Sequence, residues 1–198
     1  MIPRDELTGL VLAGGRGRRM GGCDKGLVAF DGRPLAGYAA GVLRDHVKEL
    51  VIVANRHCAA YAELADRVVA DVEPDYRGPL MGLYSGLQAA RGAWLVMVPC
   101  DVPGLPSSLV ARLVDQRGTA DVVVAHDGTR PHPVVALVRV DLADDLAACL
   151  ARGERKLDTW QARHRRVWAD FSDCPAAFTN LNTRDERLDL ERRRGKES

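Results

Sequence analysis

Net charge is almost absent from this 198-residue sequence, because 28 lysine and arginine residues balance 27 aspartate and glutamate residues and leave +1. That balance argues against a dedicated nucleic-acid-binding or membrane-surface protein. No run approaches 18 consecutive apolar residues, so we expect no membrane span. The first residues carry two acids and only a short apolar run, unlike a signal peptide. We therefore expect a cytoplasmic protein that binds neither nucleic acid nor membranes.

Paired cysteine motifs are missing too. The 5 cysteines are widely spaced and form no C-x-x-C pair, which argues against a zinc knuckle or a thioredoxin-like redox centre and favours reduced thiols. Lysine is scarce, with 4 lysines against 24 arginines, so a lysine in an unusual loop is of interest. The length predicts one domain over residues 1–198, with the charged residues 191–198 as a frayed tail.

Short apolar runs alternate with amphipathic stretches along the chain. The apolar, β-branched runs are typical of strands that are covered on both faces. We expect strands at Leu7–Ala13, Leu50–Ala54, Arg67–Ala70, Ala93–Val98, Asp121–Ala125, Val134–Val138 and Arg166–Asp170. We expect helices near Pro34–His46, Ala59–Ala65, Leu80–Ala90, Ser107–Gln116 and Asp141–Arg152, with Ser107 as an N-cap and Gly118 and Gly153 as C-terminal caps. This alternation predicts a three-layer α/β fold with a mostly parallel sheet.

The loop after the first predicted strand is rich in glycine and arginine and ends at Lys25. Glycines let backbone N–H groups approach phosphate oxygens closely, and the cations neutralise them. The loop does not fit a P-loop, because Lys25 follows Asp24 rather than glycine. It does not fit a dinucleotide fingerprint either, because Met20 stands where the third glycine belongs. The pattern therefore indicates a different triphosphate-binding loop.

Six short motifs in a fixed order point to a family. The first is L-A-G-G-x-x-x-R-M-G-x-x-D-K, which ends at Lys25. The others are Asn55-Arg56-His57, Asp71, Gly78-Pro79-Leu80-Met81-Gly82, Pro99-Cys100-Asp101-Val102-Pro103 and Asn180-Leu181-Asn182-Thr183. In order and spacing, over residues 8 to about 190, the chain resembles the nucleotidyltransferases with a Rossmann-like α/β fold. It most closely resembles the molybdenum cofactor guanylyltransferases.

The resemblance implies an activity and its ligands. Members of this family transfer GMP from GTP to the terminal phosphate of molybdenum-loaded molybdopterin, forming the guanine dinucleotide cofactor and releasing pyrophosphate. By resemblance the cofactor is Mg²⁺, and molybdoenzyme apoproteins or cofactor-insertion proteins are candidate partners. Such a reaction depends mostly on positioning and charge neutralisation.

The resemblance also assigns roles to individual residues. It assigns catalysis to Asp101, Lys25 and Arg19, nucleotide binding to Leu12, Ala13, Gly14, Gly15, Lys25, Asp71 and Asp101, Mg²⁺ to Asp101, and the pterin side to Asn180 and Asn182. A carboxylate directly after a buried strand, as at Asp101, suits the crevice where α/β sheets bind ligands. Ordinary structural explanations remain: Asp101 and Asp71 as turn residues, Lys25 as a surface lysine, and Asn182 as a cap.

Two positions leave questions open. Val53 stands where the family often has asparagine, so either a backbone group or Asn55 takes over that contact. For His132 we favour a structural role, because no second metal ligand lies at a suitable spacing.

Other functions also remain open. The chain could transfer CMP to the same pterin, or a nucleotide to another small phosphate acceptor. It could also be a non-catalytic GTP-binding adaptor that delivers the cofactor. The pair Gly14-Gly15 favours GTP over CTP, because the related cytidylyltransferases tend to carry Ala-Gly there.

Overall fold

The computed structural model describes residues 2–13, 24–73 and 78–181, which are organised around a seven-stranded sheet. The strand order is β5-β4-β1-β6-β8-β7-β9; β8 runs antiparallel to both of its neighbours, and the other pairs are parallel. The sheet strands are β1 (Leu7–Leu12), β4 (Glu49–Val53), β5 (Arg67–Val69), β6 (Trp94–Pro99), β7 (Val122–His126), β8 (Pro131–Arg139) and β9 (Arg166–Asp170).

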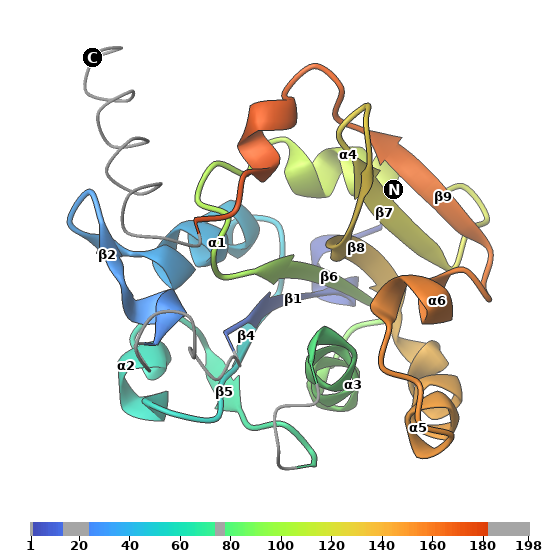
Figure 1. Cartoon of the computed structure of the whole chain (residues 1–198), viewed down its shortest axis with the longest axis horizontal. Helices are drawn as coiled ribbons and strands as arrows, with labels where there is room; N and C mark the ends of the chain where they lie inside the picture. Colours follow the sequence, from blue (N-terminus) through green and yellow to red (C-terminus); the bar gives the residue numbers. More distant parts are fainter. Residues whose placement is uncertain (1, 14–23, 74–77, 182–198) are drawn as a thin grey trace.

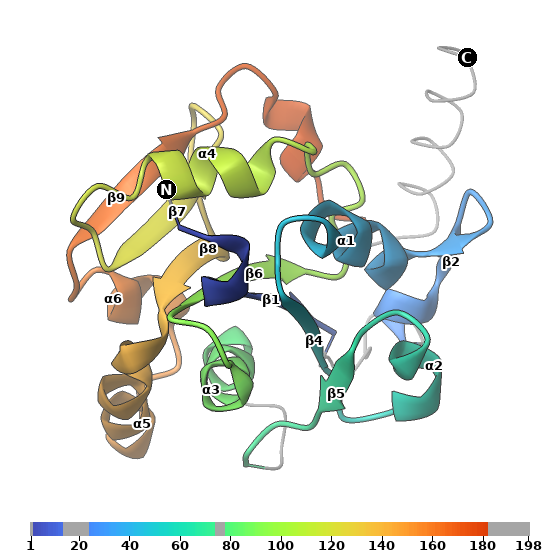
Figure 2. The same ribbon diagram turned by 180° about the vertical axis from the view of Figure 1, so that it is seen from behind.

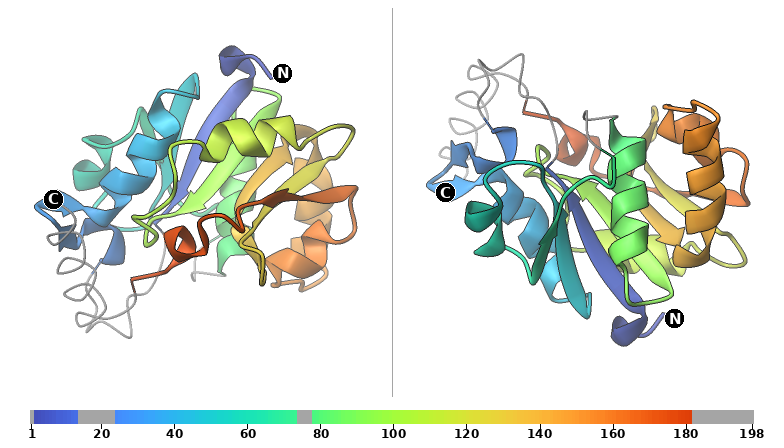
Figure 3. Two further views of the ribbon diagram at one scale, coloured as in Figure 1. Left: turned by 90° about the horizontal axis from the view of Figure 1, so that it is seen from above. Right: turned by 90° about the horizontal axis from the view of Figure 1, so that it is seen from below.

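Helices cover both faces of this sheet. Figure 1 shows α1 and α4 on one side and α3, α5 and α6 on the other, and Figure 2 shows the same layers from behind. Seen from below in Figure 3, α3 and α5 lie side by side. The helices are α1 (Leu35–Arg44), α2 (Cys58–Ala62), α3 (Pro79–Ala89), α4 (Leu109–Asp115), α5 (Ala143–Ala151) and α6 (Leu157–Gln161). The predicted three-layer α/β fold with a mostly parallel sheet is confirmed.

Two apolar cores fill the spaces between the layers. Alternate residues of a strand point to opposite faces, so β6 contributes Val96 and Val98 to the core under α1 and α4. Leu95 and Met97 of the same strand enter the core under α3 and α5. All four side chains are fully buried. This explains why the strands appear as continuous apolar runs rather than alternating ones.

Most strand ends agree with the predictions to within one residue, and β9 agrees at both ends. The exception is β8, which begins at Pro131 rather than at Val134. Its first residues include two prolines, which normally argue against a strand. A register shift in β7, between Val124 and Ala125, allows His132 to pair with Ala125 despite them.

The predictions missed two short elements and misplaced one cap. A two-stranded hairpin of β2 (Ala29–Phe30) and β3 (Arg33–Pro34) turns through Asp31 and Gly32, both with positive φ; an Asp-Gly pair is a known signal for such turns. Helix α6 was also missed. The predicted Ser107 cap is wrong, because α4 begins two residues later and its Leu109 amide bonds to the carbonyl of Pro106 instead.

The predicted C-terminal cap at Gly153 is confirmed, because this glycine directly follows the C-cap of α5 and has φ +88°. Gly118 also has a positive φ, +49°, but it lies two residues beyond the C-cap of α4, Gln116. Glycine adopts this left-handed conformation without the penalty that a Cβ atom brings.

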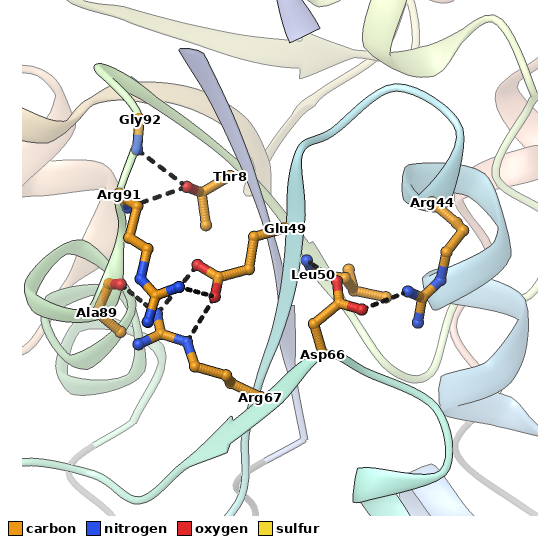
Figure 4. A network of polar contacts seen from close by, with 9 residues as sticks. All are labelled: Thr8, Arg44, Glu49, Leu50, Asp66, Arg67, Ala89, Arg91 and Gly92. Carbon is orange, nitrogen blue, oxygen red and sulfur yellow. Dashed lines mark hydrogen bonds and ion pairs between the residues drawn. The ribbon is translucent and has the colours of Figure 1, made fainter. Parts of the chain in front are cut away.

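At the amino-terminal ends of the parallel strands, the polar side chains pair with one another (Figure 4). The Glu49 carboxylate accepts from Arg67 Nη2 at 3.1 Å and forms ion pairs with Arg67 Nε, at 2.7 Å, and with Arg91 Nη1, at 3.4 Å. The Thr8 hydroxyl accepts from the backbone amides of Arg91 and Gly92, just before β6 begins. These contacts join the starts of β1, β4, β5 and β6, and they lie at the opposite end of these strands from the candidate site.

Asp121 joins three strands of the other half of the sheet. Its Oδ1 accepts from Arg139 Nη1 at 2.7 Å, at the end of β8, and from Arg165 Nη2 at 2.8 Å, just before β9. Hydrogen bonds from Arg165, together with the charges of both arginines, lower the pKa of Asp121 to about 2. The carboxylate therefore remains ionised over the whole range in which most proteins are folded.

We expect Asp121→Asn to lower the melting temperature by roughly 2–4 °C at pH 7. Because the pKa of Asp121 is lower in the folded chain than its ordinary value of 3.8, its stabilisation is fully present above about pH 4 and declines as the pH falls towards 2. The difference from wild type should therefore shrink below pH 4. Thermal unfolding between pH 7 and pH 3 tests this, and a difference that stays constant over that range would contradict it.

Two expectations about the chain's environment bear on its structure. Within the described residues, no helix is long and apolar enough to cross a membrane. The four cysteines in this part of the chain, Cys58, Cys100, Cys149 and Cys174, are free thiols, as their spacing predicts.

Candidate active site

The candidate site lies where β1 and β6 end, in the middle of the sheet. Backbone bonds continue past the strands: Ala13 donates to Val53 O at 3.0 Å and Cys100 donates to Leu12 O at 3.1 Å. The backbone pairing of β1 with its two neighbouring strands therefore extends by one residue beyond the strand ends, and Asp101 follows directly after Cys100. Ligands bind at such carboxyl ends in open α/β sheets.

Lys25 and Asp101 meet at this edge. Lys25 Nζ lies 2.5 Å from Asp101 Oδ2, with the two side chains 23% and 15% exposed. Lys25 begins a 3₁₀ turn, Lys25–Leu27, in which the Leu27 amide bonds to the carbonyl of Asp24. A tight turn and a strand end thus bring together two residues that are 76 positions apart in the sequence.

Asn180 reaches the same carboxylate from the C-terminal segment. Its Nδ2 lies 3.3 Å from Asp101 Oδ2. The next residue, Leu181, donates its backbone amide to the carbonyl of Asp101 at 2.9 Å, and its buried side chain packs with Phe30 and Leu35. Both Asn180 and Leu181 therefore anchor the C-terminal segment to Asp101, in the loop after β6.

A pocket of about 250 Å³ opens beside this cluster. Predicted nucleotide-binding residues line it together with the start of α3: Leu12, Ala13, Lys25, Val53, Asp71, Gly78, Pro79, Gly82, Pro99, Cys100, Asp101 and Val134. Gly78 has φ +85°, and a Cβ on Gly82 would lie only 2.8 Å from Leu12 Cδ2. Gly78 thus supplies the positive φ that α3 needs at its start, and Gly82 lets α3 pack closely against Leu12 in the pocket wall.

Asp71 lies in the pocket wall and is held by Asn55. The Asn55 amide donates to Asp71 Oδ2 at 2.7 Å, and its oxygen accepts from the Asp71 backbone amide at 2.9 Å. Burial raises the pKa of Asp71, while the bond from Asn55 acts in the opposite direction. The Asn55 side chain is thus bonded to Asp71. The Val53 carbonyl accepts a hydrogen bond from the Ala13 amide, so Val53 presents an apolar side chain to the pocket.

A second cavity, of about 530 Å³, has Asn180 in its lining. It shares Val134 with the first pocket, and its lining includes Arg130, His132, Phe178 and Asn180. His132 Nε2 lies 2.7 Å from Asp127 Oδ2, and the imidazole stacks on Phe178 with ring centroids 4.6 Å apart. His132 therefore has structural contacts, as we favoured, and also borders this cavity.

Some site residues lie outside the described part of the chain, and others were not anticipated. Gly14, Gly15, Arg19 and Asn182 fall outside the described residues, as do the tail residues 191–198. The structure adds contacts from Asp24 to His57 and to Tyr61, at 2.9 and 2.5 Å. No local sequence signal pointed to Tyr61, because it is a single tyrosine among alanines.

Among the described residues, no group of three or more His, Cys, Asp and Glu side chains could enclose a metal ion. Mg²⁺ does not need such a group, because it commonly binds one or two carboxylates, water and substrate phosphates. Asp101 lines the first pocket and supplies a carboxylate, the kind of hard oxygen ligand that Mg²⁺ prefers, so this residue fits the predicted Mg²⁺ ligand.

Comparison with known proteins gives one consistent result. The family of MobA-like NTP transferase domains matches residues 9–167. A molybdenum cofactor guanylyltransferase from Burkholderia vietnamiensis is 48% identical over 199 residues, covering 95% of this chain and 97% of the relative. One from Serratia proteamaculans is 46% identical over 193 residues, covering 96% and 97%. The crystal structure of molybdopterin-guanine dinucleotide biosynthesis protein A from Archaeoglobus fulgidus has the same fold, with a TM-score of 0.75, 22% identity and coverage of 96% and 99%.

Proposed function

Because the chain belongs to the family of MobA-like NTP transferase domains, we propose that it transfers GMP from GTP to molybdopterin. The product is the guanine dinucleotide form of the molybdenum cofactor, and pyrophosphate is released. The observation that carries this proposal is the cluster of Lys25, Asp101 and Asn180, which lies between two cavities at the carboxyl ends of the central strands.

The first pocket takes GTP. Its Leu12, Ala13 and Val53 wall is largely apolar and suits a purine, while Asp71 offers a carboxylate to a ribose hydroxyl or to the base. Lys25 also lines the pocket, and its ammonium neutralises the phosphates. Arg19, Gly14 and Gly15 complete the nucleotide site in this proposal.

The second cavity takes the pterin. Arg130 supplies positive charge for its phosphate, and the stacked His132–Phe178 pair forms part of the cavity wall. From here a phosphate oxygen of molybdopterin attacks the α-phosphorus of GTP, a new P–O bond forms, and the bond to the β-phosphate oxygen breaks. Lys25 stabilises the charge on the reacting phosphates, and Asn180 orients the acceptor beside Asp101.

We propose that the reaction depends on Mg²⁺ held by Asp101. When bound, Mg²⁺ neutralises phosphate charge during transfer. We also propose that the protein works in the cytoplasm and that molybdoenzyme apoproteins or cofactor-insertion proteins receive its product.

The decisive experiment incubates the protein with molybdopterin, Mg²⁺ and each nucleoside triphosphate in turn, and measures pyrophosphate. We expect release with GTP at a rate at least about tenfold above that with CTP or ATP. Faster release with CTP would make the protein a cytidylyltransferase. Tight GTP binding without any pyrophosphate would make it a delivery adaptor.

We expect Asn180→Ala to weaken molybdopterin binding about tenfold, because the amide lies in the second cavity and touches Asp101. GTP affinity should stay within about twofold, since Asn180 does not line the first pocket. Titration of each ligand separately measures both effects. A variant that loses GTP binding and keeps molybdopterin would show that this amide belongs to the nucleotide site.

A further inference from the structure

Lys25 is supported by a neighbouring cluster of three side chains that the proposed reaction does not use. The cluster consists of Asp24, His57 and Tyr61. The Asp24 side chain is 9% exposed, and each of its oxygens has a partner. Tyr61 donates its hydroxyl to Oδ1 at 2.5 Å, and His57 Nδ1 lies 2.9 Å from Oδ2.

Tyr61 is the buried member of this cluster. Tyr61 lies on α2, the helix between β4 and β5, and its side chain is fully buried. Helix α2 lies beside β5 (Figure 1). Burial, and then its bond to Asp24, raises the pKa of Tyr61 far above its ordinary value, so the hydroxyl is a donor at every working pH. His57, by contrast, is 53% exposed and provides the weaker support.

The residue on the other side of Lys25 touches the same hydroxyl. A Cβ on Gly26 would lie 2.4 Å from the Tyr61 oxygen and 3.2 Å from its ring. The residue before Lys25 is thus bonded to Tyr61 through its side chain, and the residue after Lys25 lies close to the same tyrosine. Lys25 has little freedom to move along the pocket, and its ammonium is directed towards Asp101.

We propose that Tyr61 is a positioning residue for Lys25 and acts through Asp24. The inference rests on the proposed role of Lys25 in nucleotidyl transfer. Small displacements of a charged group at a reaction centre cost large factors in rate. Loss of the Tyr61 hydroxyl loosens the 3₁₀ turn and separates Lys25 from the reacting phosphates, while the ring continues to fill the core.

The first test is a double-mutant cycle with pyrophosphate release as the readout. Tyr61→Phe should lower kcat about tenfold in the wild-type background and less than about twofold in the Lys25→Met background, because residues that act as a unit are non-additive. A residue with only a structural role would lower both rates by the same factor. Equal losses in the two backgrounds, or an unchanged rate in the single variant, would overturn the proposal.

The second test needs no catalysis. Acetylation of Lys25 by a small amine reagent is followed by mass spectrometry, with Lys48 as the internal reference, and the chain's 4 lysines make the peptides easy to assign. Tyr61→Phe should raise the labelling rate of Lys25 at least threefold without changing that of Lys48. An unchanged labelling rate of Lys25 would overturn the positioning role of Tyr61, whether or not the protein transfers nucleotides. A wild-type protein that transfers no nucleotide would refute the proposed function alone.

Tyr38→Phe is the matched control. Tyr38 lies on α1, and its hydroxyl donates to the Phe30 carbonyl at 2.9 Å. Among the described hydrogen bonds of Asp24, none involves Tyr38. The rate and the labelling of Lys25 should stay within about twofold of wild type. If Tyr38→Phe had the same effects as Tyr61→Phe, the effects would reflect general loosening and would refute the assignment.

Discussion

Asp101→Asn should lower turnover at least about 100-fold, a loss of about 3 kcal/mol of transition-state stabilisation. The substitution keeps the size of the side chain and removes its charge. It therefore removes both the ion pair with Lys25 and the proposed carboxylate ligand of Mg²⁺. GTP binding measured without Mg²⁺ should hardly change, because the rest of the pocket is intact.

The control for this variant is Asp115→Asn, which neutralises an exposed carboxylate at the end of α4 and should leave turnover unchanged. The rates are compared across a range of Mg²⁺ concentrations. We expect the Asp101 variant to need more Mg²⁺ for its remaining activity. Near-normal turnover at limiting Mg²⁺ would move the metal to another carboxylate, such as Asp71.

Lys25→Met should also reduce turnover about 100-fold, which is the usual effect of removing one group that stabilises developing charge. Methionine preserves much of the length and apolar volume of lysine, so the loss reports the ammonium group. Lys25→Arg should recover only part of the rate, because a planar guanidinium cannot replace a compact ammonium at 2.5 Å from Asp101.

Lys48→Met provides the matched control, since Lys48 lies just before β4, at the far end of the strands from Asp101. Its removal should leave turnover within about twofold. Steady-state rates for the two variants, measured at saturating GTP, separate the chemical step from binding. Equal activity of wild type and Lys25→Met would remove Lys25 from the reaction and leave Arg19 as the phosphate-neutralising residue.

Local hydrophobic patterns in the sequence predicted the positions of most strands, but they gave no information on the order of the strands in the sheet. The run from Trp94 to Pro99 is apolar because both of its faces are covered, so its strand could be recognised from sequence alone. The antiparallel direction of β8 follows from tertiary pairing and has no local signature. The Ser107 cap failed for the same kind of reason, because the backbone carbonyl of Pro106 already satisfies the helix.

The candidate site shows the same division. Asp101 and Lys25 could be identified because each lies in a motif with its own chemistry, and the structure brings them together. The contact from Asn180 to Asp101 spans 79 positions, and the Tyr61 contact with Asp24 spans 37. Neither pair has a spacing that a helix or a strand repeats, so only the folded chain reveals them.

The placement of β1 between β4 and β6 has a consequence for synthesis of the protein on the ribosome. Strands β1, β4 and β5 come early in the sequence, and β4 pairs with both of the others, so this edge of the sheet can form while later residues are still being added. The two cavities cannot form at that stage, because their walls include Asp101 from the middle of the chain and Asn180 from near its end. A nascent or prematurely terminated chain that lacks Asn180 would therefore have a partly formed sheet and an incomplete second cavity.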